Sequence, residues 1–362
     1  MPWLLPQTRS CRETEAVLRL AINGYGRIGR SILRALYEGR QRQHMQIVAI
    51  NELADARTVL HLTRYDSTHG RFTLPLTGAV GEMNIDGDRI ALLSQPDVAR
   101  LPWAQQGVDL VLECTGAFSD RATAELHLRG GAGRVLFSQP AQMDVDATVV
   151  FGVNHETLLP EHRIASAASC TTNGIVPVID ALHRALGVES GTITTIHSAM
   201  NDQPVLDAYH HTDLRKTRAA SQSIIPVDTA LARGIERILP ELAGRFTAQA
   251  LRVPTQNVSA MDLTVQVMRD TTEQEVNRIL RDAAASAYHG VLGFTMEPLA
   301  SCDFNHDPRS SIVDASQTRV SGRRLVKVLT WFDNEWAYAN RMLDVAACWG
   351  GCELTDCAGE QT

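Results

Sequence analysis

The sequence lacks the features of a membrane protein and of a nucleic-acid-binding protein. No stretch approaches the run of about 18 to 20 apolar residues that a membrane-spanning helix needs, and the N-terminal apolar cluster, Trp3 to Leu5, is too short for a signal peptide. The 34 Lys and Arg residues are outnumbered by 41 Asp and Glu residues, so the net charge is −7. Such a balance gives no attraction to nucleic acid or to an acidic membrane. We therefore expect a soluble, cytoplasmic protein without nucleic-acid or membrane partners.

The sequence also lacks a cysteine framework. Its seven cysteines are scattered, and none forms a C-x-x-C pair. An odd, dispersed set is typical of reduced thiols rather than of structural disulfides. Cys348, Cys352 and Cys357 lie near the C-terminus without a neighbouring histidine. We therefore interpret them as loose thiols and predict no metal site.

Neither an internal repeat nor a low-complexity linker divides the chain, although 362 residues suffice for two domains. We expect an irregular leader over residues 1–17 and a disordered tail over 350–362. Between them, short apolar runs alternate with helical stretches and predict a parallel α/β sheet over 18–167. The predicted strands of this region are 18–23, 46–50, 110–112, 135–137 and 148–151, with a further strand at Ile164.

The pattern changes in the second half, where we assign residues 168–333 to a catalytic, substrate-binding domain. Longer strands of alternating hydrophobicity are predicted over 192–197, 246–253, 259–267 and 325–332. Helices are predicted over 171–186, from a capping box at Thr272 towards Gly290, and over 336–348. This grouping favours an α+β domain with a mainly antiparallel sheet. We expect the last helix, 336–348, to complete the first domain.

A nucleotide site is predicted where the first strand ends. Gly24, Gly26 and Gly29 form G-x-G-x-x-G between a strand and a helix, the context in which this motif binds a dinucleotide pyrophosphate. Glu52 follows the second strand, 23 residues after Gly29, where a carboxylate can accept hydrogen bonds from a ribose. Because that carboxylate would repel a 2′-phosphate, the pattern favours NAD over NADP.

Cys170 is the candidate nucleophile. It lies in Ser169-Cys170-Thr171-Thr172-Asn173, at the predicted start of a helix whose dipole favours a thiolate. His197, at the end of a predicted strand, is a candidate base, although the sequence alone makes a structural histidine equally plausible. Arg252 lies inside an otherwise apolar strand, so its charge requires an anion from the protein or from a ligand. The cluster 214–218 could bind a phosphorylated substrate or form a solvated loop.

Together these motifs resemble the glyceraldehyde-3-phosphate dehydrogenase family. The resemblance extends from Leu18 to about Ala347 and rests on the segments 22–30, 169–173, 252–255 and 331–336. It implies a Rossmann-type NAD-binding domain, an α+β catalytic domain, a phosphorylated aldose substrate and a homotetramer. Lys216 and Arg218 would lie on a loop near a neighbouring subunit's cofactor.

Within this family the chain looks most like the branch that oxidises erythrose 4-phosphate, on the segments 50–55, 197–203 and 303–307. Met200 and Asp202 stand where glyceraldehyde-3-phosphate dehydrogenases usually have two phosphate-binding threonines. Because an aspartate would repel a phosphate there, we expect a substrate of different reach. Lys216 replaces an arginine of the family, Pro96 replaces another near the cofactor, and Gly174 replaces a second cysteine.

The resemblance also assigns roles to individual residues. Cys170 would be the nucleophile and His197 its base. Contacts to NAD would come from Gly24, Gly26, Arg27, Ile28, Gly29, Glu52, Thr115, Gly116, Ser138 and Asn334. Substrate contacts would come from Ser169, Thr171, Lys216, Thr229, Ala230 and Arg252.

The implied reaction is NAD-dependent oxidation of erythrose 4-phosphate to 4-phosphoerythronate, through a thiohemiacetal and a thioester on Cys170, in pyridoxal 5′-phosphate synthesis. Two alternatives stay open. One is a phosphorylating glyceraldehyde-3-phosphate dehydrogenase of glycolysis, and the other is a non-catalytic NAD-binding redox sensor.

Overall fold

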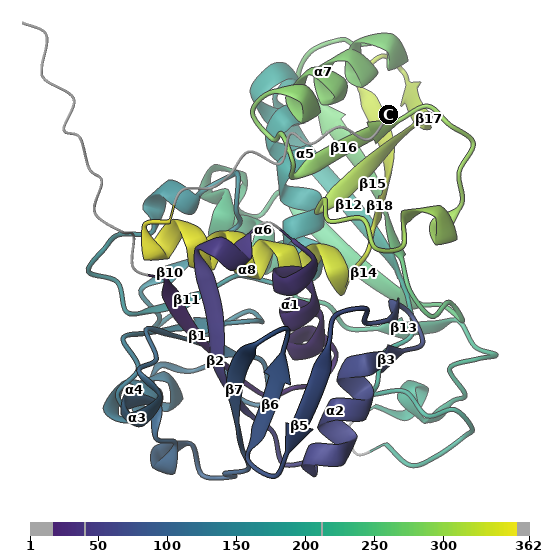
Figure 1. Cartoon of the computed structure of the whole chain (residues 1–362). Helices are drawn as coiled ribbons and strands as arrows, with labels where there is room; N and C mark the ends of the chain where they lie inside the picture. Colours follow the sequence, from purple (N-terminus) through teal and green to yellow (C-terminus); the bar gives the residue numbers. More distant parts are fainter. Residues whose placement is uncertain (1–16, 40, 211–212, 353–362) are drawn as a thin grey trace, which may run out of the picture.

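The protein is built on two β-sheets joined by a long C-terminal helix (Figure 1). The structure, a computed structural model, describes residues 17–39, 41–210 and 213–352. The predicted leader, apart from Val17, and residues 353–362 of the predicted tail lie outside these ranges.

The first sheet has nine strands within the described residues. In spatial order they are β10 (Ala147–Thr148), β11 (Ile164–Ser166), β9 (Arg134–Phe137), β8 (Leu110–Glu113), β1 (Leu18–Asn23), β2 (Met45–Asn51), β7 (Asp88–Leu93), β6 (Glu82–Ile85) and β5 (Leu76–Ala79). Pairing is parallel from β10 to β7 and antiparallel from β7 to β5. The parallel part and its helices confirm the predicted Rossmann-like fold.

Two details of this sheet differ from the sequence prediction. The strand expected over 148–151 is limited to Ala147–Thr148, because the chain turns at 151–154, where Asn154 binds back to Thr148 and Val150. The sequence reading also missed β5, β6 and β7. Their antiparallel pairing is set by neighbouring strands, and β5 is largely exposed, so it gives little hydrophobic periodicity.

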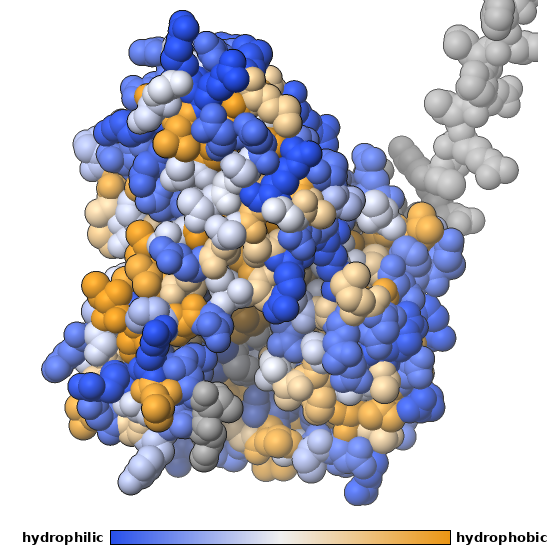
Figure 2. Space-filling view, turned by 180° about the vertical axis from the view of Figure 1, so that it is seen from behind, coloured by the Kyte–Doolittle hydropathy of each residue, from blue (hydrophilic) through white to orange (hydrophobic). Residues whose placement is uncertain are grey.

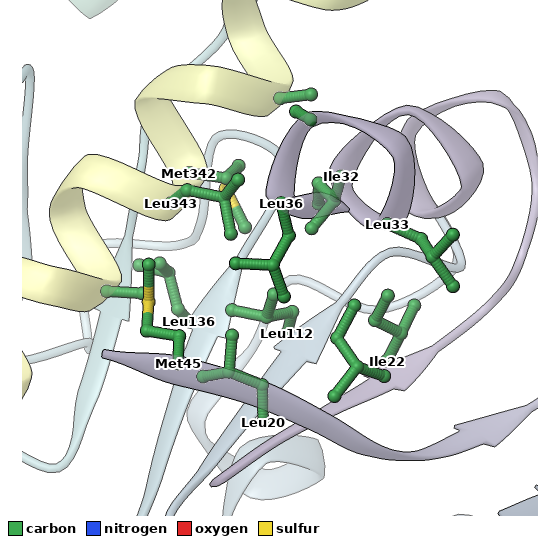
Figure 3. Packing of buried hydrophobic residues seen from close by; sticks show 14 of the residues in the cluster. Leu20, Ile22, Ile32, Leu33, Leu36, Met45, Leu112, Leu136, Met342 and Leu343 are labelled. Atoms are coloured by element: carbon green, nitrogen blue, oxygen red, sulfur yellow. The ribbon is translucent and has the colours of Figure 1, made fainter. Parts of the chain in front are cut away.

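Helices cover both faces of this sheet. On one face, α1 (Arg27–Glu38) and α8 (Trp336–Gly350) pack over Leu20 and Ile22 (Figure 3). On the other face, α3 (Trp103–Gln106) and α4 (Arg121–Arg129) pack against Ala21 and its neighbours. The alternation along β1 follows from the two-residue repeat of a strand. A further helix, α2 (Ala56–Arg64), lies next to β5.

The second sheet has seven strands within the described residues. In spatial order they are β13 (Ile225–Val227), β14 (Phe246–Arg252), β12 (Val188–His197), β15 (Ser259–Val267), β18 (Leu325–Phe332), β17 (Ser311–Ser321) and β16 (Leu292–Thr295). Only β12–β14 and β16–β17 pair in parallel, so the prediction of a mainly antiparallel sheet is confirmed.

Three helices pack on one face of the second sheet: α5 (Cys170–Leu186), α6 (Leu231–Ile238) and α7 (Glu273–Ala285). Met261, Leu263, Val265 and Val267 of β15 are fully buried beneath them. The side chain of Thr272 caps α7 as predicted, but the helix ends at Ala285 rather than near Gly290.

The predicted tail begins too early. Gly350 is the last residue of α8, and Gly351 takes the left-handed conformation that closes the helix. Cys352 folds back, packs against the first core and donates its N–H to Ala347. Cys348 belongs to α8 itself, so neither of these thiols is loose. The Gly-Gly pair is thus a helix stop rather than the start of a tail.

No helix in the described ranges is long and apolar enough to cross a membrane. The same residues contain no group of three His, Cys, Asp or Glu side chains placed to hold a metal ion. Cys114, Cys170, Cys302 and Cys348 are free thiols.

Candidate active site

The glycine loop shows which of its residues must be glycine. Gly24 has φ +90°, and a Cβ there would lie 2.6 Å from the backbone of Thr115. A Cβ at Gly29 would lie 2.4 Å from the carbonyl oxygen of Gly24, so this glycine allows α1 to pack against the loop. A Cβ at Gly26 would meet nothing within 4 Å. The space above Gly26 is therefore open on the side where a pyrophosphate would approach the first turn of α1.

A groove of about 370 Å³ opens at the carboxyl ends of β1, β2 and β8. Gly24, Gly26, Glu52, Thr115 and Pro96 are among its lining residues. This is the edge at which parallel α/β sheets bind ligands. The Glu52 carboxylate accepts the N–H groups of Tyr25, Leu53 and Ala54, which leaves lone pairs on its oxygens for a ribose hydroxyl.

The side chain of Arg27 is bound by other residues and is not free to bind a phosphate. Its guanidinium is held by the carboxylates of Asp66 and Glu335, in part through a 2.8 Å bond from Nε to Glu335 Oε1. What Arg27 and Ile28 offer a pyrophosphate is therefore their backbone N–H groups, which lack partners within the helix because they lie in its first turn.

Thr115, Gly116 and Ser138 lie where β8 and β9 end, at the same edge of the sheet. The backbone N–H of Thr115 donates to the buried carboxylate of Glu113, as does its hydroxyl. Gly116 has φ +72°. The neighbouring Cys114 thiol is buried, and burial raises its pKa above the ordinary range.

Asn334 lies at the boundary between the two sheets. Its side-chain oxygen accepts hydrogen bonds of 2.9 Å from the hydroxyls of Ser198 and Ser259, which follow β12 and begin β15. These bonds fix the amide and leave its nitrogen as a donor, the group that a nicotinamide carbonyl requires.

Cys170 is the first residue of α5, which begins one residue before the predicted helix 171–186. Ser169 caps the helix by accepting the N–H of Thr172 at 3.0 Å. The expected preference for a thiolate is not met in this structure: burial raises the pKa of Cys170 to about 11, and Arg252 and the backbone N–H groups of the first turn offset it only in part. Desolvation of the thiolate outweighs the helix dipole here.

His197 ends β12 and is paired in register with Arg252 at the end of β14. Burial and the neighbouring Arg252 guanidinium lower the pKa of His197 to about 4, so its imidazole is neutral at neutral pH. Nδ1 of His197 lies 2.6 Å from Nη1 of Arg252 and 2.9 Å from the carbonyl oxygen of Ser198. These contacts are alternatives, because Nδ1 either accepts from Arg252 or donates to Ser198.

Cys170 and His197 share their surroundings, although the structure shows no hydrogen bond between the two side chains. The charges of Arg252 and Glu335 act on both of them. Arg252 makes no ion pair with any described carboxylate, and its buried Nε has no partner. Asp202 favours the charge of Arg252 without forming an ion pair, so the described residues compensate its burial only in part, as expected of a group that receives an anionic ligand.

The remaining substrate candidates lie at two helix starts. Ser169 and Thr171 flank the start of α5, where their hydroxyls are 3.0 Å apart, and Thr229 and Ala230 precede α6. The two helices pack closely where Gly234 meets Thr172: a Cβ on Gly234 would lie 2.7 Å from the Thr172 hydroxyl. The Ser169 and Thr229 hydroxyls already accept the N–H groups of Thr172 and Leu231, so the other N–H groups of each first turn are the ones that an anion could use.

No described contact connects Lys216 to Ser169, Thr171, Thr229 or Ala230. Its Nζ donates to Asp202 at 2.7 Å, and this partner overcomes the effect of burial and lowers the pKa of Asp202. Lys216 therefore offsets part of the negative charge that Asp202 would present to a phosphate.

Two family models match the chain. The glyceraldehyde 3-phosphate dehydrogenase NAD binding domain matches residues 18–121, and the C-terminal domain of the same family matches residues 169–334. The chain belongs to the glyceraldehyde 3-phosphate dehydrogenase family. It therefore has an NAD-binding domain and a catalytic domain of an NAD-dependent dehydrogenase, and its cofactor is NAD.

Sequence reasoning missed the residues that hold this family's motifs in place. The carbonyl oxygen of Ala168, a non-glycine residue with φ +57° two positions before Cys170, accepts the hydroxyl of Tyr338 at 2.8 Å. The fully buried Asp333 accepts the N–H groups of Glu335, Trp336 and His306, together with the Asn257 amide. Both Asp333 and Tyr338 lie in or next to the 331–336 motif, but only their partners in space reveal what they do.

Proposed function

We propose that this dehydrogenase oxidises D-erythrose 4-phosphate to 4-phospho-D-erythronate, as a step of pyridoxal 5′-phosphate synthesis. The observation that carries the proposal is the arrangement around Arg252. The half-buried guanidinium of Arg252 makes no ion pair with a described carboxylate, contacts His197 and acts electrostatically on Cys170. A phosphorylated aldehyde supplies the anion that Arg252 lacks and the carbonyl that Cys170 attacks.

The preference for a four-carbon sugar rests on Asp202. This side chain stands where relatives acting on the triose usually have a phosphate-binding threonine, and it is tied to Lys216. The pair offers a carboxylate and an ammonium group for sugar hydroxyls, and the positive field of Arg252 also reaches it. A longer, hydroxylated substrate can use both groups, whereas the Asp202 carboxylate cannot bind a second phosphate.

The chain's own residues account for the covalent steps. The Cys170 sulfur bonds to the aldehyde carbon and forms a thiohemiacetal, while His197 passes the thiol proton to the carbonyl oxygen. The groove lined by Gly24, Gly26 and Glu52 would hold NAD, which would supply the hydride acceptor for that carbon. His197 takes the hydroxyl proton, and the acyl group remains on Cys170 as a thioester. Water then displaces the thiol, so one aldehyde, one water and one oxidised cofactor give the acid, the reduced cofactor and a proton.

Arg252 also determines which tautomer of His197 is present. When Arg252 donates to Nδ1, the imidazole carries its proton on Nε2. Nε2 then has no lone pair with which to accept a proton. A substrate phosphate draws the Arg252 donors to itself, and Nδ1–H can then donate to the carbonyl oxygen of Ser198. In this tautomer Nε2 carries the lone pair and can act as the base.

We also propose a homotetramer. The loop between β12 and β13 exposes several large apolar side chains, among them Leu206 and Leu214, which are 75% and 84% exposed. Figure 1 places this loop on the right, and orange residues gather on the corresponding left side of Figure 2. An apolar patch of this kind marks a protein interface. The cytoplasmic location stays a prediction from the sequence.

The test is the rate of NADH formation from erythrose 4-phosphate and from glyceraldehyde 3-phosphate, each with and without inorganic phosphate. We expect faster oxidation of the four-carbon sugar and no requirement for phosphate. Faster, phosphate-dependent oxidation of the triose would instead make the protein a phosphorylating glyceraldehyde-3-phosphate dehydrogenase. NAD binding without turnover of either sugar would favour the redox sensor.

A further inference from the structure

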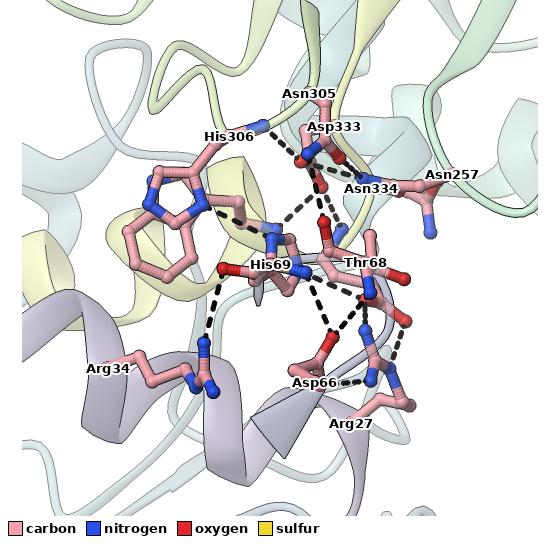
Figure 4. Close-up of polar contacts among 12 residues, drawn as sticks. Arg27, Arg34, Asp66, Thr68, His69, Asn257, Asn305, His306, Asp333 and Asn334 are labelled. Carbon is pink, nitrogen blue, oxygen red and sulfur yellow. Dashed lines mark hydrogen bonds and ion pairs between the residues drawn. The ribbon is translucent and has the colours of Figure 1, made fainter. Parts of the chain in front are cut away.

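Two histidines from different parts of the fold face each other beside α8 (Figure 4). His69 lies in the turn between β3 (Tyr65–Asp66) and β4 (Gly70–Arg71), and His306 lies just after a short 3-10 turn, Ser301–Phe304. Their Nδ1 atoms are 3.2 Å apart. The His306 ring stacks on Trp336 with a centroid distance of 3.6 Å.

The outer nitrogens of both rings face carboxylates. His69 Nε2 lies 3.2 Å from Glu335 Oε2, and His306 Nε2 lies 2.9 Å from Glu38 Oε2. A carboxylate oxygen only accepts, so each Nε2 carries a proton. The contact between the two Nδ1 atoms then requires a third proton, since two lone pairs at this distance would repel. This arrangement of contacts therefore needs three protons, one more than two neutral imidazoles carry.

The surroundings favour the positive charge that the third proton brings. Glu335, Glu38, Asp66 and Asp333 all contact the pair: the last two accept the backbone N–H groups of His69 and His306. The facing cations are Arg27, which binds Asp66 and Glu335, and Arg34, which donates to the carbonyl oxygen of His69. Arg30 interacts electrostatically with Glu335. Stacking on an indole also favours a cation.

The pair is connected to the cofactor site through Glu335. This carboxylate holds the guanidinium of Arg27, the first residue of α1, and it directly follows Asn334. Burial raises the pKa of Glu335, but the hydrogen bonds from Arg27 and His69 outweigh burial and keep it below the ordinary value. Glu335 thus ties the start of the phosphate-binding helix to the residue that would face the nicotinamide.

We propose that His69 and His306 are positioning residues that share one proton and, through Glu335, hold Arg27 and Asn334 in place for NAD. When the shared proton is lost, the contact between the rings is lost, Glu335 is held less firmly and NAD binds more weakly. The proposal depends on the family's NAD binding and not on the identity of the sugar substrate.

The test is isothermal titration calorimetry with NAD from about pH 6 to about pH 9, in buffers of different ionisation enthalpy. Because the protonated pair binds NAD more tightly, linkage requires that binding takes up protons. We expect the Kd for NAD to rise by about fivefold across this range. A Kd that does not change with pH, or binding that releases protons, would overturn the proposal.

Replacement of His306 by asparagine separates the hydrogen bond from the charge. Asparagine tolerates the left-handed backbone of position 306, φ +69°, and its amide can donate to His69 Nδ1 without titrating. We expect His306→Asn to fold, to bind NAD as tightly as the wild type does at low pH, and to lose the pH dependence.

The matched control is His61→Asn, which removes an exposed imidazole on α2 that stacks only on Tyr65 among the described rings. We expect this variant to keep the wild-type pH dependence. If His306→Asn also keeps it, the pair is not the titrating group. A ¹⁵N spectrum of the imidazoles gives a second readout: one imidazolium shared by His69 and His306 is expected at low pH, and two neutral rings there would contradict the proposal.

Discussion

At Cys170, burial and the helix N-terminus act on the thiol in opposite directions. Burial disfavours the thiolate, while Arg252 and the first N–H groups of α5 favour it. The net pKa of about 11 means that the resting thiol is protonated, so activation depends on the groups that substrate binding rearranges. His197, whose pKa of about 4 keeps it neutral at physiological pH, becomes a base at Nε2 once Arg252 releases Nδ1.

The first prediction concerns the pH dependence of this thiol. Because its pKa is raised, alkylation of Cys170 by iodoacetamide should accelerate steadily between about pH 7 and pH 10, by close to tenfold per pH unit. Arg252→Gln removes a charge that favours the thiolate, so it should slow alkylation at a fixed pH by roughly three- to tenfold. Arg129→Gln, an exposed arginine on α4, should change nothing. Equal rates for wild type and Arg252→Gln would contradict this account.

Cys170→Ser provides a prediction about turnover. A serine hydroxyl is a far weaker nucleophile, so kcat should fall by about 10⁴-fold or more. The cofactor groove does not include Cys170, so the Kd for NAD should stay within about twofold of wild type. A variant that retained substantial turnover would show that Cys170 is not the nucleophile.

At the scale of elements, neighbouring positions of one motif have different structural roles. In the loop before α1, Gly24 and Gly29 are required by backbone packing, whereas Gly26 only leaves space open. At the start of α8, the buried Asp333 serves as the common acceptor for donors from three segments. Elements that meet at the cofactor site are thus held by contacts that their own sequences do not reveal.

The glycine loop gives a paired prediction. Gly24→Ala places a Cβ against the Thr115 backbone in a left-handed conformation, so it should lower the free energy of unfolding by about 3 kcal/mol or more. Gly26→Ala should unfold like the wild type but bind NAD roughly tenfold more weakly, because its methyl group occupies the approach to the pyrophosphate. Chemical denaturation and calorimetry measure the two effects. The interpretation fails if Gly26→Ala binds NAD normally.

Asp333→Asn tests the start of α8. The amide nitrogen would face backbone N–H groups that now donate to a carboxylate oxygen, so the free energy of unfolding should fall by about 3 kcal/mol. Asp270→Asn removes an exposed carboxylate paired with Arg324 and should have little effect. Similar denaturation midpoints for the two variants would show that Asp333 is not a structural hub.

At the scale of the whole molecule, the two sheets carry different parts of the site. The first sheet offers the groove and the glycine loop, and the second offers His197, Arg252 and the starts of α5 and α6. Helix α8 packs on α1, while Asn334, which precedes it, is fixed by serines of the second sheet. The cofactor site therefore depends on how the two halves are joined.

The proposed tetramer is tested on the apolar loop before β13. Leu206→Asp introduces a charge into a patch that we expect to be buried between subunits, so light scattering should show dissociation into smaller species. Val80→Asp is the matched control, because Val80 is 97% exposed at the tip between β5 and β6. A wild-type protein that is monomeric at micromolar concentration would rule out the tetramer.

The sequence by itself determined the class of protein. Local patterns specify many of the strands, such as 18–23 and 325–332, the glycine loop and the helix start at Cys170, because periodicity, turns and caps are properties of neighbouring residues. It also identified Arg252 as a charge in need of an anion, since a lone arginine in an apolar strand is visible without a fold.

Only the tertiary structure determines which charged and titratable side chains contact one another. The pairing of Lys216 with Asp202, the clamp of Glu335 on Arg27 and the contact of His69 with His306 join residues far apart in the chain. The raised pKa of Cys170 likewise depends on desolvation by residues from several elements. Electrostatic energies depend on distance and burial in three dimensions, and neither quantity can be read from the order of residues along the chain.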